Sequence, residues 1–164
     1  MKEKFPHRKQ LRLKEYDYSQ EGYYFITICT QNKKHILGKI INGIDKPVGA
    51  NCVRPIMKLS KIGHIINKEI NKISKIYDNI FIDEYVIMPN HIHLIIEIED
   101  GRTQFAPTIS QIIKQYKGSI TKQLNYSIWQ KSFYEHVIRN EKEYYLIKQY
   151  IQDNPLNWEK DKYY

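Results

Sequence analysis

Hydrophobic residues follow two different spacings along this chain, and the spacing predicts where strands and helices lie. Residues 22–30 are dense in aromatic and β-branched side chains, which is typical of a buried strand. Residues 80–88 and 91–99 have the same character and flank Pro89-Asn90, a dipeptide that favours turns. These two segments are therefore expected to form a β-hairpin.

Apolar residues recur at intervals of three and four in two other segments, as they do on one face of a helix. Residues 60–77 carry an isoleucine stripe of this kind, with Ser60 as the expected N-cap. A second helix is expected over residues 108–124, because Thr108 and Gln111 match a capping box. Both apolar faces are expected to pack into the core.

Three further segments complete the predicted order. Residues 38–55 contain repeated Gly and Pro, which predicts a loop with a short hairpin. A short strand is expected at 134–139 and a last helix at 141–153, ended by Pro155. The whole order predicts an α+β fold, the ferredoxin-like split βαβ arrangement, with an antiparallel sheet. Its two long helices should cover one face and the C-terminal helix the other, with segment 91–99 in the middle of the sheet.

The length of 164 residues is that of one domain. We expect a single domain over residues 1–164, in which residues 1–20 form a basic N-terminal arm and residues 141–164 form the C-terminal helix and tail. The formal net charge of +8 favours a polyanionic partner, with nucleic acid ahead of an anionic membrane surface. The sequence has neither an apolar run of about 18 residues nor a signal peptide, so a cytoplasmic protein without a membrane partner is expected.

Basic residues form two candidate groups for contacts to a phosphate backbone. The group in the arm consists of Arg8, Lys9, Arg12 and Lys14. The second group consists of Lys114, Lys117 and Arg139. The alternative is that the arm is a solvated terminus and that the lysines of residues 108–124 lie on a solvated helix face.

Several enzyme classes lose support because their motifs are missing. The sequence contains no Gly-rich phosphate loop, no dinucleotide-binding turn and no HExxH helix. Its two cysteines, Cys29 and Cys52, do not have the spacing of a zinc cluster or a redox pair. Nucleotide-dependent and zinc-protease functions are therefore disfavoured.

Two histidines, His91 and His93, stand one residue apart in the second strand of the predicted hairpin. Alternate side chains of a strand share a face, so the two imidazoles are expected about 6 to 7 Å apart along it, with Ile92 pointing into the core. Two imidazoles so placed can hold one cation. The same spacing also occurs on half-exposed strands, where each ring bonds to water, but the apolar flanks here favour a functional reason for the pair.

The last predicted helix brings a second pair of side chains into consideration. Tyr150 and Asn154 are four residues apart and share a helix face. If this helix crosses the histidine face, Tyr150 presents a phenolic oxygen and Asn154 a carbonyl oxygen as a third ligand. Such a mixed set suits Mg²⁺ or Mn²⁺. Spacing alone favours a packing role for Tyr150, because the chain contains 14 tyrosines.

Five segments together resemble the REP-associated tyrosine transposases, a branch of the single-tyrosine insertion-sequence transposases. The hairpin Val86-Ile87-Met88-Pro89-Asn90-His91-Ile92-His93-Leu94-Ile95 resembles the HUH motif of that family. The other matching segments are residues 12–19, 24–30, 129–140 and 150–155. The resemblance runs from about residue 8 to the C-terminus.

The resemblance implies roles for four residues. His91 and His93 would be metal ligands, and Tyr150 would be the nucleophile. Asn154 would be the third ligand, at a position where related insertion-sequence transposases carry glutamine. That exchange keeps the amide oxygen but shortens its reach.

The implied activity is metal-dependent cleavage and rejoining of single-stranded DNA near hairpins, through a 5′-phosphotyrosine. Two alternatives stay open: a module that binds structured single strands without chemistry, and a metal-dependent nuclease in which water attacks. The implied partner is single-stranded DNA with hairpin structure. Insertion-sequence relatives work as dimers whereas the REP-associated branch tends to be monomeric, so a monomer or a homodimer is expected.

Overall fold

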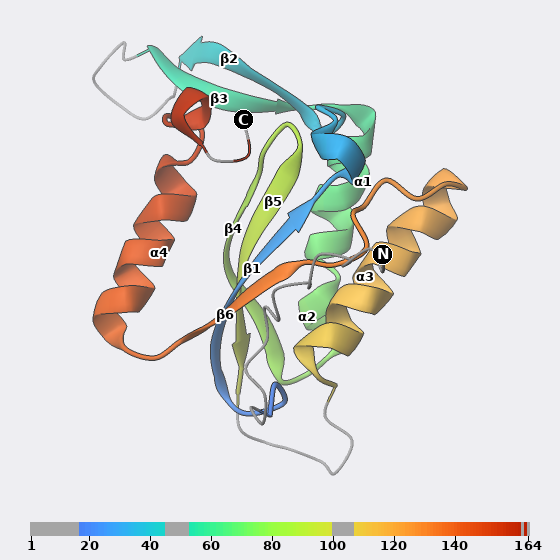
Figure 1. Ribbon diagram of the computed structural model, residues 1–164, viewed down its shortest axis with the longest axis vertical. Helices are drawn as coiled ribbons and strands as arrows, with labels where there is room; N and C mark the ends of the chain where they lie inside the picture. Colours follow the sequence, from blue (N-terminus) through green and yellow to red (C-terminus); the bar gives the residue numbers. More distant parts are fainter. Residues whose placement is uncertain (1–16, 45–52, 100–106, 162, 164) are drawn as a thin grey trace, which may run out of the picture.

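The computed structural model describes residues 17–44, 53–99, 107–161 and 163. Its main sheet contains four strands: β1 (Gly22–Cys29), β4 (Ile80–Ile87), β5 (His91–Ile98) and β6 (Tyr134–Ile138). They are ordered β4-β5-β1-β6, and every neighbouring pair is antiparallel (Figure 1). The central strands are therefore β5 and β1, as expected for the ferredoxin-like arrangement, and the predicted fold class is confirmed.

The helices lie in two layers on opposite faces of this sheet. They are α1 (Lys61–Ile70), α2 (Ile73–Ile76), α3 (Ile109–Leu124) and α4 (Glu141–Asp153), with two short 3-10 helices, η1 (Gln31–Lys33) and η2 (Trp158–Lys160). Figure 1 shows α1, α2 and α3 on one side of the sheet and α4 alone on the other. Within the described ranges, no helix has the length and apolar character needed to cross a membrane.

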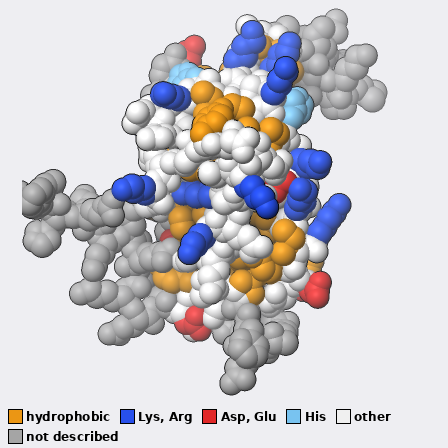
Figure 2. Space-filling model, turned by 90° about the vertical axis from the view of Figure 1, so that its right-hand side faces the viewer, with side chains coloured by type: hydrophobic (Ala, Val, Ile, Leu, Met, Phe, Trp, Pro, Cys, Tyr) orange, Lys and Arg blue, Asp and Glu red, His pale blue; other side chains and the backbone are white. Residues whose placement is uncertain are grey.

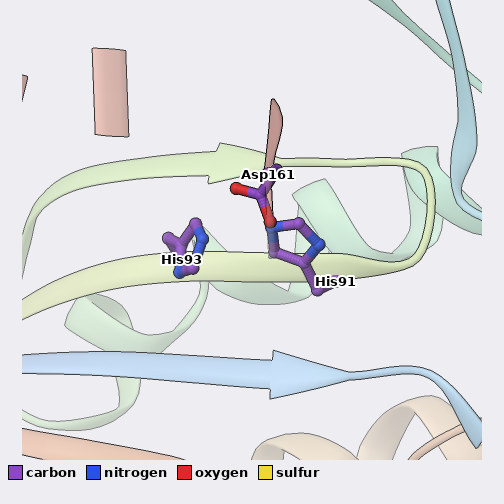
Figure 3. A group of neighbouring side chains, drawn as sticks. All are labelled: His91, His93 and Asp161. Atoms are coloured by element: carbon purple, nitrogen blue, oxygen red, sulfur yellow. The ribbon is translucent and has the colours of Figure 1, made fainter. Parts of the chain in front are cut away.

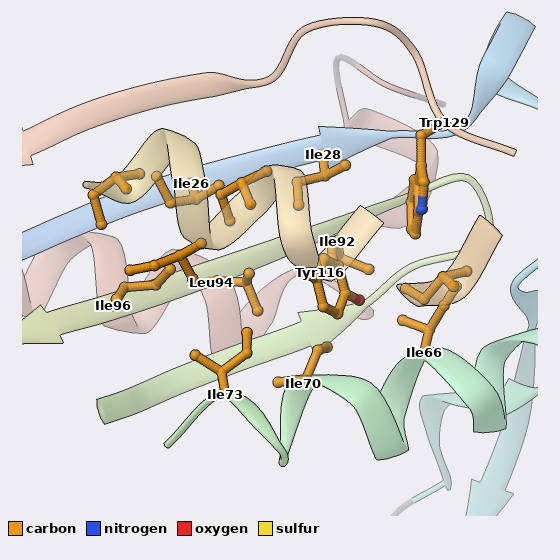
Figure 4. Packing of buried hydrophobic residues seen from close by; sticks show 14 of the residues in the cluster. Ile26, Ile28, Ile66, Ile70, Ile73, Ile92, Leu94, Ile96, Tyr116 and Trp129 are labelled. Atoms are coloured by element: carbon orange, nitrogen blue, oxygen red, sulfur yellow. The ribbon is translucent and has the colours of Figure 1, made fainter. Parts of the chain in front are cut away.

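The main core lies between the sheet and the layer of α1, α2 and α3. Ile26 and Ile28 of β1, and Ile92, Leu94 and Ile96 of β5, are fully buried on this face. Figure 4 shows them facing the helical side chains Ile66, Ile70, Ile73 and Tyr116. Because strand side chains alternate, the residues between them point to the face that α4 crosses.

Both predicted N-caps are present. Ser60 Oγ accepts from the Gly63 amide at 3.0 Å and donates to the Ile36 carbonyl at 2.7 Å, which ties the start of α1 to the preceding loop. Thr108 and Gln111 form the reciprocal bonds of a capping box at the start of α3. These bonds satisfy amide groups that the first turn of a helix leaves without partners.

The prediction of one continuous helix over residues 60–77 is wrong. It ends at Ile70 and resumes as α2 after Asn71 and Lys72. The amide Nδ2 of Asn71 donates to the Asn67 carbonyl at 2.7 Å, so a side chain takes part in closing the last turn. Asparagine competes for backbone groups in this way, which explains a break inside a regular apolar pattern.

The segment expected to be a loop with a short hairpin is more regular than predicted. Strands β2 (Gly38–Ile44) and β3 (Val53–Leu59) pair over their full lengths and form a sheet of their own. Figure 1 shows this hairpin close to the red segment that follows α4. The many Gly and Pro residues concealed its alternating apolar positions.

Gly63 and Gly118 offer a matched test of helix packing. A Cβ at Gly63 would lie 2.1 Å from the Leu37 carbonyl oxygen, whereas a Cβ at Gly118 in α3 would have no described atom within 4 Å besides its own chain neighbours and the nearby backbone of its helix. We expect Gly63→Ala to lower the free energy of unfolding by about 1–3 kcal/mol. Gly118→Ala should raise it by about 0.5–1 kcal/mol, because alanine loses less entropy in a helix. Urea denaturation measures both, and equal effects would contradict the close approach at Gly63.

Candidate active site

The two histidines project from the central strand β5 toward α4. In the β1–β5 ladder His91 stands opposite Cys29 and His93 opposite Thr27. Both imidazoles have no exposed surface, and their ring centroids are 4.5 Å apart. The rings therefore lean toward each other from their positions on the strand, and Ile92 between them points into the main core as predicted.

Each imidazole is oriented by a hydrogen bond at Nδ1. His93 Nδ1 lies 2.8 Å from Thr27 Oγ1, and His91 Nδ1 lies 2.7 Å from Asn90 Oδ1. The Asn90 amide is itself oriented, because its Nδ2 donates to the Tyr163 carbonyl at 2.6 Å. Since Asn90 Oδ1 only accepts, His91 carries its proton on Nδ1, and in the neutral ring Nε2 has the lone pair. This is the tautomer that a metal ligand needs.

The tyrosine helix α4 rests on the histidine face of the sheet. Its buried residue Ile151 packs in a small apolar cluster with Phe25 of β1, Ile95 of β5 and Ile138 of β6. Phe25 also stacks on the His93 ring, with centroids 5.3 Å apart. The cluster thus places α4 directly beside the histidine pair, as the sequence predicted.

Polar contacts fix α4 along the edge strand β4. Tyr144 Oη donates to Asp83 Oδ2 at 2.9 Å, and Lys148 Nζ bridges both oxygens of the same carboxylate at 3.2 Å. One turn later, Gln152 Nε2 donates to Glu84 Oε2 at 2.7 Å. These bonds set the position of the helix along its axis, which apolar packing alone leaves loose.

Tyr150 lies next to the histidine pair. Its Oη is 3.3 Å from His93 Nε2 and donates to Asp161 Oδ2 at 3.1 Å. The side chain is 39% exposed, so a substrate can reach it from solvent. Burial raises the pKa of Tyr150 well above its ordinary value, and the negative charge of Asp161 raises it further. The resting residue is therefore a neutral phenol.

The other tyrosines considered as nucleophiles have different surroundings. The Tyr144 hydroxyl is engaged by Asp83 and Lys148, and Tyr145 points outward with 58% of its surface exposed. Tyr134 on β6 packs edge-on against Phe25, with ring centroids 6.2 Å apart. Of these candidates, Tyr150 is the one whose hydroxyl contacts the histidine pair.

Asn154 and Asp161 bring oxygen atoms to the same place. Asn154 is 1% exposed, and its Nδ2 donates to Asp161 Oδ2 at 3.0 Å. Within the described residues, its carbonyl oxygen Oδ1 is buried without a hydrogen-bond partner. Ligand atoms of His91, His93 and Asp161 all lie within 4.8 Å of one another, with the carboxylate above the two rings (Figure 3). Two imidazoles with carboxylate and amide oxygens fit Mg²⁺ or Mn²⁺ in chemical type.

Asp161 was not among the site residues predicted from the sequence. The residue follows α4 by eight positions and returns to the site because η2 folds the chain back over the end of the helix. Tyr163, also missed, has its ring 4.7 Å from that of His91. Neither residue belongs to a periodic segment, so hydrophobic spacing carried no signal for them.

Known proteins similar to this chain point to one family, although no family model matches it. An uncharacterised protein of Haemophilus influenzae is 36% identical over 183 residues, covering 96% of this chain and 93% of that protein. A REP-associated tyrosine transposase of Escherichia coli K12 is 35% identical over 75 residues, covering 46% of this chain and 44% of its own length. A putative REP-associated tyrosine transposase of H. influenzae is 24% identical, covering 85% and 73%.

A solved structure of a REP-associated tyrosine transposase bound to a REP hairpin has the same fold. Its TM-score to this chain is 0.62 at 23% identity, covering 89% of this chain and 74% of that one. The chain belongs to the REP-associated tyrosine transposases. Its relatives named as transposases point to a DNA-processing enzyme.

The predicted DNA-binding residues of this chain do not form one cluster. Lys114 is exposed on α3, and Arg139 is exposed on the other side of the sheet, just before α4. Lys117 donates to the carbonyls of Gln130 and Ser132, at 3.0 Å each. Burial lowers the pKa of Lys117 to about 8. Its ammonium group thus stabilises the loop before β6. The four residues Arg8, Lys9, Arg12 and Lys14 lie outside the described residues.

A capping arrangement joins the start of α4 to β6. Asn140 Oδ1 accepts from the Glu143 amide, and Glu143 Oε2 accepts from the Arg139 amide, at 2.9 Å each. Glu143 Oε1 also lies 2.7 Å from His136 Nε2. The Arg139 amide bond, followed by the His136 contact, lowers the pKa of Glu143.

The lowered pKa of Glu143 predicts a pH-dependent contribution to the stability of this protein. The folded chain holds the carboxylate more acidic than the unfolded chain, so the contribution is complete above the unfolded pKa and is lost as the pH falls through the folded pKa. We expect the stability difference between the wild type and Glu143→Gln to shrink from about pH 6 to about pH 4. Glu141→Gln is the control, since it removes a charge from the same turn without touching His136. Urea denaturation across this range measures both, and a constant difference would contradict the assignment.

Proposed function

We propose that this REP-associated tyrosine transposase cleaves and rejoins single-stranded DNA near hairpins, with a divalent metal and a 5′-phosphotyrosine intermediate. The observation that carries the proposal is the position of Tyr150 Oη, 3.3 Å from His93 Nε2 and 3.1 Å from Asp161 Oδ2. A nucleophile next to a set of metal-ligating atoms is the arrangement that phosphoryl transfer needs. The hairpin-bound relative of the same fold supports the substrate class.

His91, His93 and Asn154 are proposed to hold the metal, with Asp161 as a further oxygen donor. The Nδ1 bonds of both histidines direct Nε2 outward from the strand, and Asn154 offers a buried carbonyl oxygen. A bound Mg²⁺ or Mn²⁺ would polarise the scissile phosphate and neutralise the charge that develops on its oxygens.

Tyr150 performs the transfer itself. Its Oη attacks the phosphorus and forms a P–O bond as the bond from phosphorus to the 3′ oxygen breaks. The phenolic proton passes to Asp161 Oδ2, which already accepts its hydrogen bond, and the 3′ oxygen takes a proton from solvent water as it leaves as a hydroxyl. The reverse attack by a 3′-hydroxyl on the phosphotyrosine rejoins a strand without an external energy source.

Basic side chains on the molecular surface suit a DNA backbone. Lys and Arg side chains stand out over the face seen from the α3 side, with few acidic side chains among them (Figure 2). Lys114 and Arg139 are proposed backbone contacts, together with the arm residues Arg8, Lys9, Arg12 and Lys14. Such contacts position a nucleic acid without reading its sequence.

The nucleophile assignment predicts a covalent adduct. With Mn²⁺ and a hairpin oligonucleotide, the wild type should become attached to 3′-labelled strands and release 5′-labelled fragments, because the tyrosine keeps the 5′ phosphate. Tyr150→Phe should abolish the adduct, and Tyr145→Phe, one exposed hydroxyl on the same helix, should leave it unchanged. A denaturing gel measures all three.

Three other results of this gel would contradict the proposed function or the choice of nucleophile. Cleavage without attached protein would replace the proposal by a nuclease in which water attacks. Binding without cleavage would replace it by a module that only binds structured strands. An adduct that survives Tyr150→Phe would overturn the choice of tyrosine.

The proposed ligand set predicts a ranking of Mn²⁺ affinities. His91→Ala should weaken binding by more than tenfold, because a strand-held imidazole is lost, and His64→Ala, an exposed histidine on α1, should not change it. Asn154→Ala and Asp161→Ala test the two oxygen donors separately. Asp161→Ala should weaken Mn²⁺ binding more than Asn154→Ala, because the oxygen that it removes is anionic. Calorimetric titration measures the series. Equal affinity in wild type and His91→Ala would refute the histidine site.

A further inference from the structure

A pocket of ≈ 640 Å³ lies between the β2–β3 hairpin and the segment that follows α4. We call it the flank pocket. Its volume falls within the range of about 300–1,000 Å³ that small-ligand sites occupy. The side chains that give it chemical character are His35, Lys39, Asn42, Leu156, Trp158 and Lys160.

The flank pocket adjoins the candidate active site. The Trp158 ring, which lines it, is 6.0 Å from the His91 ring, centroid to centroid. Pro89 and Pro155 also line it, and they directly precede Asn90-His91 and follow Asn154. The nucleotide next to a phosphate held at the histidines would therefore lie within reach of this pocket.

The lining suits a nucleotide better than an apolar peptide. Trp158 is buried, and the exposed His35 ring packs against its indole at 5.4 Å between centroids. His35 and Leu156, which is 47% exposed, therefore offer flat and apolar surface to a base. Lys39 and Lys160 supply two cations for phosphate oxygens. One acidic side chain, Glu159, also lines the pocket. Stacking on rings together with cations along the backbone is how proteins hold unpaired nucleotides.

Side-chain amides give the pocket a means of choosing among bases. Asn42 of β2 and Asn157 stand on its two walls, and both are exposed. An amide offers a donor and an acceptor, which distinguish the edges of the bases. The β2–β3 hairpin and the chain after α4 thus contribute equivalent groups from opposite sides.

We propose that the flank pocket binds one unpaired nucleotide next to the scissile phosphate and so restricts the base that flanks the cleavage site. This inference rests on the proposed function, because it takes single-stranded DNA as the substrate. It assigns to the protein a part of the sequence recognition at the cut, in addition to contacts with the hairpin.

Binding is tested with the full chain carrying Tyr150→Phe, which stops the chemistry without altering the lining. The probes are fluorescent hairpin oligonucleotides with a short single-stranded extension on the 5′ or 3′ side, and the same strands with abasic positions in the extension. Loss of the base should weaken binding about tenfold, the size of one stacked base. His35→Ala combined with Asn42→Ala should remove this difference, because these side chains are the ones that face the base, and His64→Ala, an exposed histidine on α1, should preserve it.

A cross-linking measurement keeps the test independent of the variants' stability. Extensions that carry 5-iododeoxyuridine should cross-link on irradiation to peptides containing His35 or Trp158. Equal affinity for intact and abasic extensions, or cross-links confined to other peptides, would overturn the flank pocket.

The two proposals can fail separately. Wild type with Mn²⁺ that forms equal amounts of adduct on intact and abasic extensions would keep the proposed function and refute the pocket. Base-dependent binding and the expected cross-links without any adduct would keep the pocket and refute the tyrosine chemistry.

Discussion

The pairing of β1 with β5 at the centre of the sheet is the constraint on which the rest of the structure depends. Its register sets every side chain of β5 on one of two faces: Ile92, Leu94 and Ile96 enter the main core, and His91 and His93 face α4. A shift of one residue would exchange the two sets and place imidazoles among isoleucines. The hydrophobic core therefore specifies the position of the histidines, and a central strand holds them rigidly.

The tyrosine helix is attached to this rigid face in a different way. Ile151 is the buried residue of α4, and its outer face exposes Tyr145 and Leu146. Hydrogen bonds and ion pairs to Asp83, Glu84 and His136 hold both ends of the helix instead. Directional bonds define the position of Tyr150 more sharply than a small apolar contact can, although each adds little to stability because water competes for the same groups.

The parts of this structure that local sequence could predict are those that local physics determines. The strand alternation around His91 and His93, the caps at Ser60 and Thr108, and the spacing of Tyr150 were all visible because each depends on neighbours in the chain. The break at Asn71, the regular β2–β3 hairpin and the use of Lys117 on backbone carbonyls were not. Those features depend on which carbonyl group or strand each residue meets in the folded chain, and local sequence does not determine this.

Asp161 shows most clearly what local sequence cannot predict, because its effect on the site depends on the residues that it meets in the folded chain. Its carboxylate accepts hydrogen bonds from Tyr150 and Asn154, and together with burial it raises the pKa of the phenol. A neutral phenol is a poor nucleophile unless its proton leaves as the new bond forms. Burial and the charge of Asp161 keep Tyr150 protonated, and the hydrogen bond to Asp161 is the path by which that proton can leave in the proposed reaction. Positive charge beside the histidines would favour the phenolate, so in the proposed reaction metal binding and activation of the tyrosine are linked through this one carboxylate.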